Sequence, residues 1–278
     1  MGRLEGRVAF ITGASSGIGA ALGREFARRG AHVALGARRV DRLESLAAEL
    51  TRLGHRAIVI SCDVTREGEL EAAVARTREA LGRIDVLVAN AGFGVMGRLE
   101  VLTLQDYRRQ FETNVFGVLR TIYAGLDEIK RTRGRIVIMG SVAGHLGAPG
   151  SSAYAMSKFA VRGLAQALAP ELAAHGVAVT LVSPGFVESE IHEVDNRGVR
   201  HPGAHDAVKW LRMPGEKAAR QIVSATVRRR REVVITGHGK AIVFLQRHAP
   251  WLVAWLVRRS GVRQHRREAA APPAADAP

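Results

Sequence analysis

A tyrosine and a lysine four residues apart, Tyr154 and Lys158, have types and spacing suited to proton transfer. On an α-helix, side chains at positions i and i+4 project from the same face, so the two groups can converge. The ordinary pKa of a phenol is about 10, and a neighbouring ammonium favours the phenolate and moves this pKa toward the neutral range. Ser141 follows an apolar segment at 134–139 and could hydrogen-bond the oxygen that the phenol protonates. A packed ring beside a solvated amine has the same spacing, so a second signal is needed.

A glycine-rich turn near the N-terminus supplies the second signal. The apolar segment 7–11 leads into a turn that contains Gly13, Ser15, Ser16, Gly17, Ile18 and Gly19, and an amphipathic helix is predicted from there to about residue 29. Between a strand and a helix, glycines permit a tight turn, and the free N–H groups of the helix N-terminus bind a pyrophosphate. The alternative is a purely structural connection between the two elements.

Apolar strand-like and helical segments alternate along the chain. Strands are predicted at 7–11, 31–36, 56–61, 84–89, 134–139, 177–182 and 232–236, and further helices at 41–53, 67–81, 104–131, 152–174 and 216–229. Alternation of this kind favours a parallel sheet that is covered by helices on both faces. The predicted fold class is therefore α/β, a single Rossmann-like doubly wound domain with a mainly parallel seven-stranded sheet.

The order of the motifs resembles that of the short-chain dehydrogenase/reductase family over about residues 6–237. The chain has TGxxxGxG at 12–19, Asp63 after the third strand, NAG from Asn90 to Gly92, the helix residue Asn114, Ser141, YxxxK from Tyr154 to Lys158, and Pro184 with Gly185. Two positions depart from the family pattern. Ala89 stands where the family commonly has a first asparagine, and Ser189 stands where a threonine often follows the proline–glycine turn. Neither departure touches the catalytic set.

This resemblance implies hydride transfer between a nicotinamide and a carbonyl or alcohol. Tyr154 would be the general acid in reduction and the general base in oxidation, and Ser141 would hydrogen-bond the developing oxyanion. Lys158 would hold the nicotinamide ribose and lower the pKa of the phenol. Asn114 would hold a water that links Lys158 to solvent, or else is only a polar residue of its helix.

The resemblance also implies most of the cofactor contacts. Asp63 and Val64 would contact the adenine, and the backbone near Val187 would contact the carboxamide. The remaining residues assigned to the cofactor by resemblance are Asn90, Gly92 and Pro184, together with Tyr154 and Lys158.

The end of the second strand favours NADP over NAD as the cofactor. An acidic residue at this position would accept the ribose hydroxyls of NAD, whereas this chain has Arg38 and Arg39. A guanidinium binds a phosphate in bidentate fashion, so the two arginines suit the 2′-phosphate of NADP. The alternative is that both are solvated residues at the start of the next helix.

Composition limits the class of protein further. The length of 278 residues fits one large α/β domain. The single cysteine, Cys62, excludes an intramolecular disulfide and a cysteine-based metal cluster, and the histidines lack ligand spacing, so no metal is predicted. The N-terminal residues enter the first strand without an apolar leader, so we expect a cytoplasmic location.

Nearly all of the net charge of +15 lies in the C-terminal third. Residues 1–196 contain 24 basic and 21 acidic residues, whereas 197–267 contain 17 basic and 3 acidic ones. Basic runs flank an apolar stretch at 241–257, which is too short and too interrupted to span a bilayer. The segment 241–267 is predicted to lie on an anionic membrane surface as a peripheral anchor. A dimer contact or packing against its own domain are the alternatives, and a nucleic-acid role is not predicted because a recognised binding fold is lacking.

The expected organisation is a Rossmann-fold domain at 1–239 with a substrate lid at about 186–213, an apolar and basic extension at 240–268, and a disordered tail at 269–278. The protein is expected to be a homo-oligomer that acts on a small carbonyl or alcohol of apolar character. An NADP-binding regulatory or scaffold protein without turnover is the alternative function. The identity of the substrate stays open.

Overall fold

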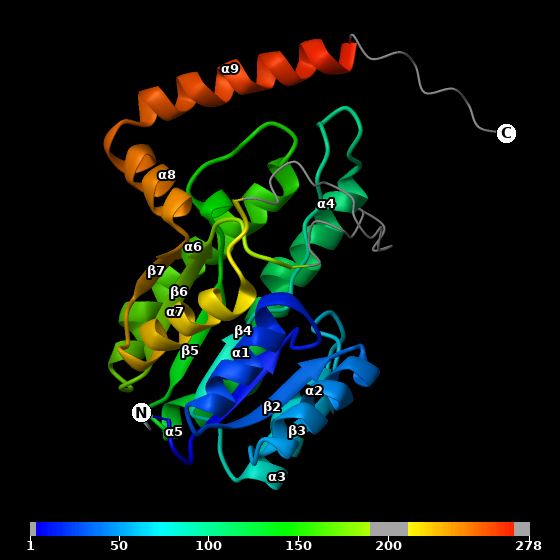
Figure 1. Cartoon of the computed structure of the whole chain (residues 1–278), viewed down its shortest axis with the longest axis vertical. Helices are drawn as coiled ribbons and strands as arrows, with labels where there is room; N and C mark the ends of the chain where they lie inside the picture. Colours follow the sequence, from blue (N-terminus) through cyan, green and yellow to red (C-terminus); the bar gives the residue numbers. More distant parts are fainter. Residues whose placement is uncertain (1–3, 190–210, 270–278) are drawn as a thin grey trace, which may run out of the picture.

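The first strand, β1 (Val8–Thr12), is buried along its whole length. Val8 and Phe10 belong to one core cluster, while Ala9 and Ile11 belong to another. Successive residues of a strand point to opposite faces, so this strand requires a layer of helices on each side of its sheet. The computed structural model describes residues 4–189 and 211–269, and its side chains as far as residue 259, and it has this arrangement (Figure 1).

Seven parallel strands form one sheet in the order β3-β2-β1-β4-β5-β6-β7. After β1 the strands are His32–Ala37 (β2), Ala57–Ser61 (β3), Val86–Ala89 (β4), Arg135–Met139 (β5), Ala178–Pro184 (β6) and Glu232–Ile235 (β7). The chain moves outward from β1 in one direction to β3 and then crosses back to β4 on the other side of β1. Ligands of open α/β sheets bind at the carboxyl ends of the strands beside such a reversal. The predicted fold class is confirmed.

Helices cover both faces of the sheet (Figure 1). They are Gly17–Arg28 (α1), Val40–Arg52 (α2), Glu69–Leu81 (α3), Leu104–Phe111 (α4), Gly117–Arg131 (α5), Ser152–Ala173 (α6), Gly215–Val227 (α7), Gly237–His248 (α8) and Pro250–Ala269 (α9). Apolar residues of α1, α2 and α7 pack in the first core cluster. Those of α3, α5 and α6 pack in the second. Each fully buried Leu, Ile or Phe side chain contributes roughly 1.5–3 kcal/mol to this packing.

The segment 104–131, which the sequence predicts as one helix, is interrupted in its middle. A π-helix, Glu112–Phe116, separates α4 from α5, and Asn114 lies in it with its side chain fully buried. A π-turn holds one more residue than an α-turn, so it changes which side chains face inward, and such turns are frequent at functional sites.

The C-terminal extension forms two helices in place of one apolar stretch. α8 ends at His248 and α9 begins at Pro250. A proline has no N–H to donate, so it suits the first position of a new helix and does not suit the interior of one. α9 runs away from the sheet along one end of the molecule (Figure 1). Within 4–189 and 211–269, no helix has both the length and the hydropathy needed to cross a bilayer. Most of the predicted lid and the predicted tail, at 190–210 and 270–278, lie outside the described residues.

Candidate active site

The glycine turn lies at the carboxyl end of β1 and packs tightly against the segment that follows β4. Gly13 has a φ of +68°, and a Cβ there would lie 2.8 Å from the Cα of Ala91. A Cβ on Gly19 would collide with the carbonyl oxygen of Gly13 and lie 2.7 Å from the Asn90 amide nitrogen. Side chains are thus excluded at both positions, and the backbone of the turn borders an open cavity.

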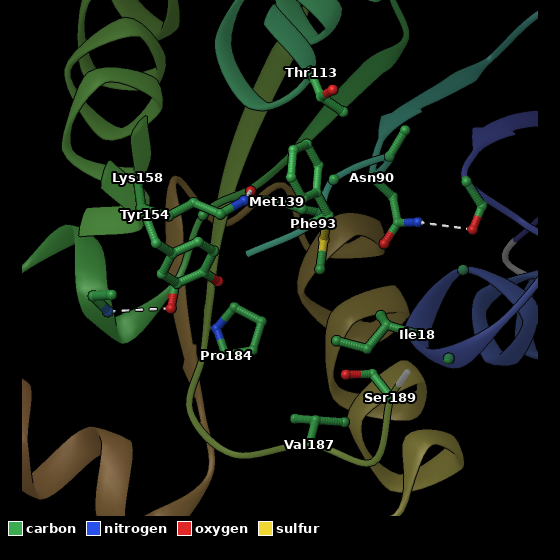
Figure 2. A pocket seen from close by; sticks show the side chains of 18 of the residues that line it. Ile18, Asn90, Phe93, Thr113, Met139, Tyr154, Lys158, Pro184, Val187 and Ser189 are labelled. Carbon is green, nitrogen blue, oxygen red and sulfur yellow. Dashed lines mark hydrogen bonds between the residues drawn. The ribbon is translucent and has the colours of Figure 1, made fainter. Parts of the chain in front are cut away.

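Asn90 holds this turn in place. Its side-chain amide donates to the carbonyl oxygens of Thr12, at 2.9 Å, and of Gly13, at 3.2 Å. The Thr12 hydroxyl accepts in return from the backbone N–H of Asn90 at 3.1 Å. Asn90, predicted from resemblance as a cofactor-binding residue, therefore also fixes the backbone that borders the cavity (Figure 2).

The two arginines after β2 have different surroundings. Arg39 donates from Nη2 to the hydroxyl oxygens of Ser16, at 2.7 Å, and Ser15, at 3.1 Å. Arg39 therefore lies over the glycine turn, and the alternative of a merely solvated residue does not describe it. Arg38 is 77% exposed, and its Nη1 lies 3.7 Å from a carboxylate oxygen of Asp63. Both line the cavity and follow β2, whereas Lys158 contacts the end of β5, three strands away in the sheet.

Asp63 is kept ionised at the adjacent wall. Burial would raise the pKa of its carboxyl, but the backbone N–H and hydroxyl of Thr65 both donate to it, at 3.0 and 2.8 Å. With Arg38 and Arg66 nearby, the pKa of Asp63 lies below its ordinary value. Next to it, burial raises the pKa of the Cys62 thiol to about 12, so this cysteine is an inert thiol.

Ser141, Tyr154 and Lys158 converge on the other end of the cavity. Tyr154 lies in the first turn of α6, and its hydroxyl hydrogen-bonds the Ser141 hydroxyl. The Ser141 oxygen also accepts from the Ala143 N–H at 3.1 Å, so its own hydrogen can be donated to the tyrosine oxygen. Lys158 is buried, and its Nζ donates to the Met139 carbonyl at 2.9 Å and lies 5.6 Å from the centre of the Tyr154 ring. Figure 2 shows both side chains reaching into the same space.

The pKa of Tyr154 differs from the sequence-based expectation. Burial raises it above its ordinary value, and the hydrogen bond from Ser141 opposes that rise only partly. Burial also lowers the pKa of Lys158 to about 8, and among the described residues no carboxylate offsets this effect. In the protein without ligand the pKa of Tyr154 therefore lies above its ordinary value, whereas the sequence predicts a shift toward the neutral range. Desolvation is the largest cause of the shift in both groups.

The unfolding free energy of the wild type minus that of Lys158→Met is expected to rise with pH. The pKa of Lys158 is lowered from 10.5 to about 8, so between these values the unfolded chain holds a proton that the folded chain has released. The destabilisation that the buried Lys158 ammonium causes is present in full below pH 8, and it is relieved as pH rises from about 8 to 10.5. It amounts to about 3 kcal/mol.

Urea unfolding of both proteins at pH 7 and pH 10 measures this difference. Lys217→Met, which removes an exposed lysine of α7, is the matched control. If the gap between wild type and Lys158→Met is the same at both pH values, the Lys158 ammonium carries no burial penalty.

Asn114 connects the segment after β4 to α6 and does not line the cavity. Its Oδ1 accepts from the Phe93 N–H at 3.1 Å, and its Nδ2 donates to the Phe93 carbonyl at 3.0 Å and the Ser157 hydroxyl at 3.3 Å. Ser157 neighbours Lys158 in the chain, so Asn114 aligns two walls of the site. Its predicted role in holding a water beside Lys158 stays a prediction.

The cavity that joins these groups has a volume of about 1050 Å³. Apart from Asn114, it is lined by every residue predicted for catalysis or cofactor binding, which are Gly13, Ser15, Ser16, Gly17, Ile18, Gly19, Arg38, Arg39, Asp63, Val64, Asn90, Gly92, Ser141, Tyr154, Lys158, Pro184 and Val187. It is also lined by residues outside this set. Phe93, Met96 and Leu146 lie in the loops at 93–99 and 145–151, which the sequence predicts to border the substrate, whereas His238 and Ile242 were not predicted. The position of His238 gave a signal, because it lies two residues after the last predicted strand, at the edge where all parallel strands end.

Comparison of the sequence with known families gives a clear match. The model of the short chain dehydrogenase family matches residues 7–199. Oxidoreductase UcpA of Salmonella typhimurium is 44% identical over 195 residues, which cover 69% of this chain and 74% of the relative.

Solved structures resemble this one along most of the chain. An alcohol dehydrogenase from Thermococcus sibiricus, complexed with 5-hydroxy-NADP, has a TM-score of 0.74 and 33% identity, with 83% of this chain and 96% of that one covered. A short-chain dehydrogenase/reductase from Burkholderia phymatum, in complex with NAD, has a TM-score of 0.82 and 26% identity, with 91% and 96% covered. The two neighbours thus carry different nicotinamide nucleotides.

Proposed function

The chain belongs to the short-chain dehydrogenase/reductase family, and from this premise we propose that it is an NADP(H)-dependent oxidoreductase that interconverts a carbonyl and an alcohol. The observation that carries the proposal is one continuous cavity, with Ser141, Tyr154 and Lys158 at one end and the glycine turn with Arg38 and Arg39 at the other. The first group suits proton exchange with a substrate oxygen, and the second suits the phosphates of a dinucleotide.

The residues of the cavity fit a dinucleotide. The glycine turn offers backbone N–H groups at the start of α1, where side chains on Gly13 or Gly19 would block close approach. Arg38 and Arg39 would hold the 2′-phosphate, Asp63 and Val64 the adenine, and Lys158 the nicotinamide ribose. The backbone near Val187 would hold the carboxamide.

The chemistry follows from what each side chain can do with a proton. When bound, the nicotinamide supplies or accepts the hydride. Tyr154 donates its proton to the substrate oxygen in reduction, and its raised pKa keeps the phenol protonated for this task at neutral pH. Ser141 stabilises the negative charge that develops on the same oxygen. Lys158, 5.6 Å from the ring centre, stabilises the phenolate that remains.

The preference for NADP rests on the absence of an acidic residue after β2, where residues 36–39 read Gly-Ala-Arg-Arg. A guanidinium would attract the 2′-phosphate, whereas the ribose hydroxyls of NAD find no carboxylate there. The neighbouring structures carry either nucleotide, so they favour a nicotinamide cofactor in general and leave the preference to these residues.

Arg38→Gln is expected to weaken NADPH binding about tenfold or more and to leave NADH binding nearly unchanged. A charged hydrogen bond contributes about 1.5–3 kcal/mol, and glutamine removes the charge without placing a second carboxylate beside Asp63. The measurement is the dissociation constant of each nucleotide by fluorescence titration.

The matched control for this change is Arg66→Gln. Arg66 also lies near Asp63 and pairs with Glu69 at 3.6 Å, but it does not line the cavity. The NADP assignment is wrong if the wild-type protein binds NADH as tightly as NADPH.

The reaction itself is tested by following NADPH oxidation with a panel of carbonyl compounds of graded hydrophobicity. Phe93, Met96, Leu146 and Ile242 line the cavity, so apolar ketones and aldehydes are expected to turn over best. The alternative function, an NADP-binding scaffold without turnover, predicts tight NADPH binding and no oxidation with any compound.

The two C-terminal helices favour a second role, attachment to an anionic membrane surface. Phe244 of α8 is 62% exposed and Trp251 of α9 is 73% exposed. Trp255, one turn after Trp251 on the same face, is half-exposed with the Arg259 guanidinium 5.3 Å from its ring centre. Exposed basic side chains accompany them, namely Lys240, Arg247, Arg258 and Arg259. Aromatic residues beside cations on a helix are typical of segments that lie in a bilayer interface.

The double substitution Trp251→Gln/Trp255→Gln is expected to release the protein from anionic vesicles. The measurement is co-sedimentation with phosphatidylserine-containing and with phosphatidylcholine vesicles at rising salt, together with sizing in solution. Each nearby arginine contributes about 1 kcal/mol on an anionic surface, so wild-type binding should weaken with salt.

Substitutions test this surface better than truncation, because α8 supplies His238 and Ile242 to the cavity. Leu53→Gln is the control, because Leu53 is a similarly exposed apolar residue that follows α2 and lies outside the C-terminal helices. If the wild-type protein stays in the supernatant as a dimer and the double variant is a monomer, this surface is a subunit contact and not a membrane anchor.

A further inference from the structure

The end of β6 and the segment after it, residues 184–188, form one wall of the cavity and are held by backbone hydrogen bonds on one side. The Gly185 N–H donates to the Ile235 carbonyl at 3.3 Å. Met213 donates to the Phe186 carbonyl and accepts from the Glu188 N–H, each at 3.0 Å.

This pairing leaves the peptide groups of Val187 available. In a paired strand, backbone groups alternate in direction, so those of Val187 point away from Met213. No other part of the described chain hydrogen-bonds them, and Val187 lines the cavity. Figure 2 shows Val187 below Pro184 at this wall.

Residues of α8 also support this wall. The Phe186 N–H donates to Nε2 of His238 at 3.0 Å, and the two rings lie 5.4 Å apart between centres. The Thr236 hydroxyl lies 3.1 Å from the same nitrogen and already accepts from the Gly239 N–H at 3.1 Å. An Nε2 that accepts from the Phe186 N–H carries no hydrogen of its own, so the Thr236 hydroxyl is the donor in its contact with this nitrogen.

Two features of the backbone confirm how tightly this contact is built. A side chain on Gly185 would collide with Thr236 Oγ1 and His238 Nε2, so the wall rests directly on these two residues. Thr236 itself has a φ of +80°, a conformation that β-branched residues rarely adopt. Such backbone strain persists only where the surrounding contacts enforce it.

We propose that His238 is a positioning residue for the cofactor, which holds the Phe186 amide so that the peptide groups of Val187 face the nicotinamide carboxamide. This inference rests on the proposed function, because it requires a nicotinamide nucleotide in the cavity. It makes the first turn of α8 part of the active site, although the sequence predicts a domain boundary immediately after it, at residue 239.

The test compares binding of the whole cofactor with binding of its adenine half. Dissociation constants of NADPH and of 2′,5′-ADP are measured for the wild type and for His238→Leu. Loss of this acceptor from the Phe186 N–H is expected to weaken NADPH binding roughly tenfold. The affinity for 2′,5′-ADP should stay unchanged, because that molecule does not reach Val187.

Two further variants separate positioning from folding. In His238→Gln, the side-chain oxygen can take the place of Nε2, so NADPH affinity should be largely restored. Lys240→Gln, at an exposed residue of the same helix, is the matched control and should behave as wild type. Should His238→Leu not fold, His238→Asn serves in its place, because its amide is too short to reach Phe186.

The outcomes distinguish this inference from the proposed function. Wild-type protein that binds neither NADPH nor NADH would overturn the proposed function. If the wild type prefers NADH, the comparison is made with NADH and ADP-ribose, and the inference stands or fails as before. The inference is wrong if the wild type binds the dinucleotide but His238→Leu weakens the binding of NADPH and of 2′,5′-ADP equally, or weakens neither. His238 then does not position the nicotinamide wall.

Discussion

Tyr154→Phe is expected to lower kcat by about a hundredfold to ten-thousandfold while NADPH still binds, because general acid catalysis contributes a factor of this size. The substitution removes only the hydroxyl, which is the proton donor, and it leaves the ring that lines the cavity. The measurements are steady-state turnover with the best carbonyl of the panel and the dissociation constant of NADPH.

Tyr123→Phe is the matched control for this result. Tyr123 lies on α5 with 71% of its surface exposed, so loss of its hydroxyl should leave both turnover and binding unchanged. Near-native turnover of Tyr154→Phe would show that another group supplies the proton and would overturn the proposed mechanism.

Ser141→Ala is expected to lower kcat by roughly a hundredfold to a thousandfold, the usual cost of removing one donor from a developing oxyanion. The Ser141 hydroxyl also hydrogen-bonds Tyr154 and opposes the rise in the pKa of the phenol that burial causes. Its loss should therefore raise the pKa of Tyr154 further and shift the pH profile of alcohol oxidation, which needs the phenolate, to higher pH.

Ser141→Thr separates this chemical role from a structural one. The Ser141 oxygen accepts from the Ala143 N–H at 3.1 Å, and a threonine keeps this acceptor and the donor alike. Turnover should recover in part with threonine. A Ser141→Ala enzyme with unchanged turnover and an unchanged pH profile would remove Ser141 from the mechanism.

The fold and the family could be predicted because both depend on local patterns. Strands and helices are recognised by their period of hydrophobic residues and by their length, and alternation of the two leaves few arrangements other than a doubly wound sheet. The comparisons confirm the family, and the sheet order confirms the fold. The pairing of Tyr154 with Lys158 was equally predictable, since four residues on a helix set it. The roles of these residues stay predictions.

The relations between distant segments could not be predicted in this way. The contacts of Asn114 depend on a π-turn inside a helix, and those of Arg39 depend on where the glycine turn lies after folding. His238 contacts a residue 52 positions earlier, and nothing in the local pattern around either residue indicates it.

The sequence by itself thus determined the sheet, the family and the presence of a serine, a tyrosine and a lysine suited to proton transfer. Only the tertiary structure decided the pKa directions of Tyr154 and Lys158, which are opposite to those of a simple ion pair. The physical reason is that desolvation depends on every atom that surrounds a group. Spacing along a helix brings two charges together, but the rest of the fold decides how much water each of them loses.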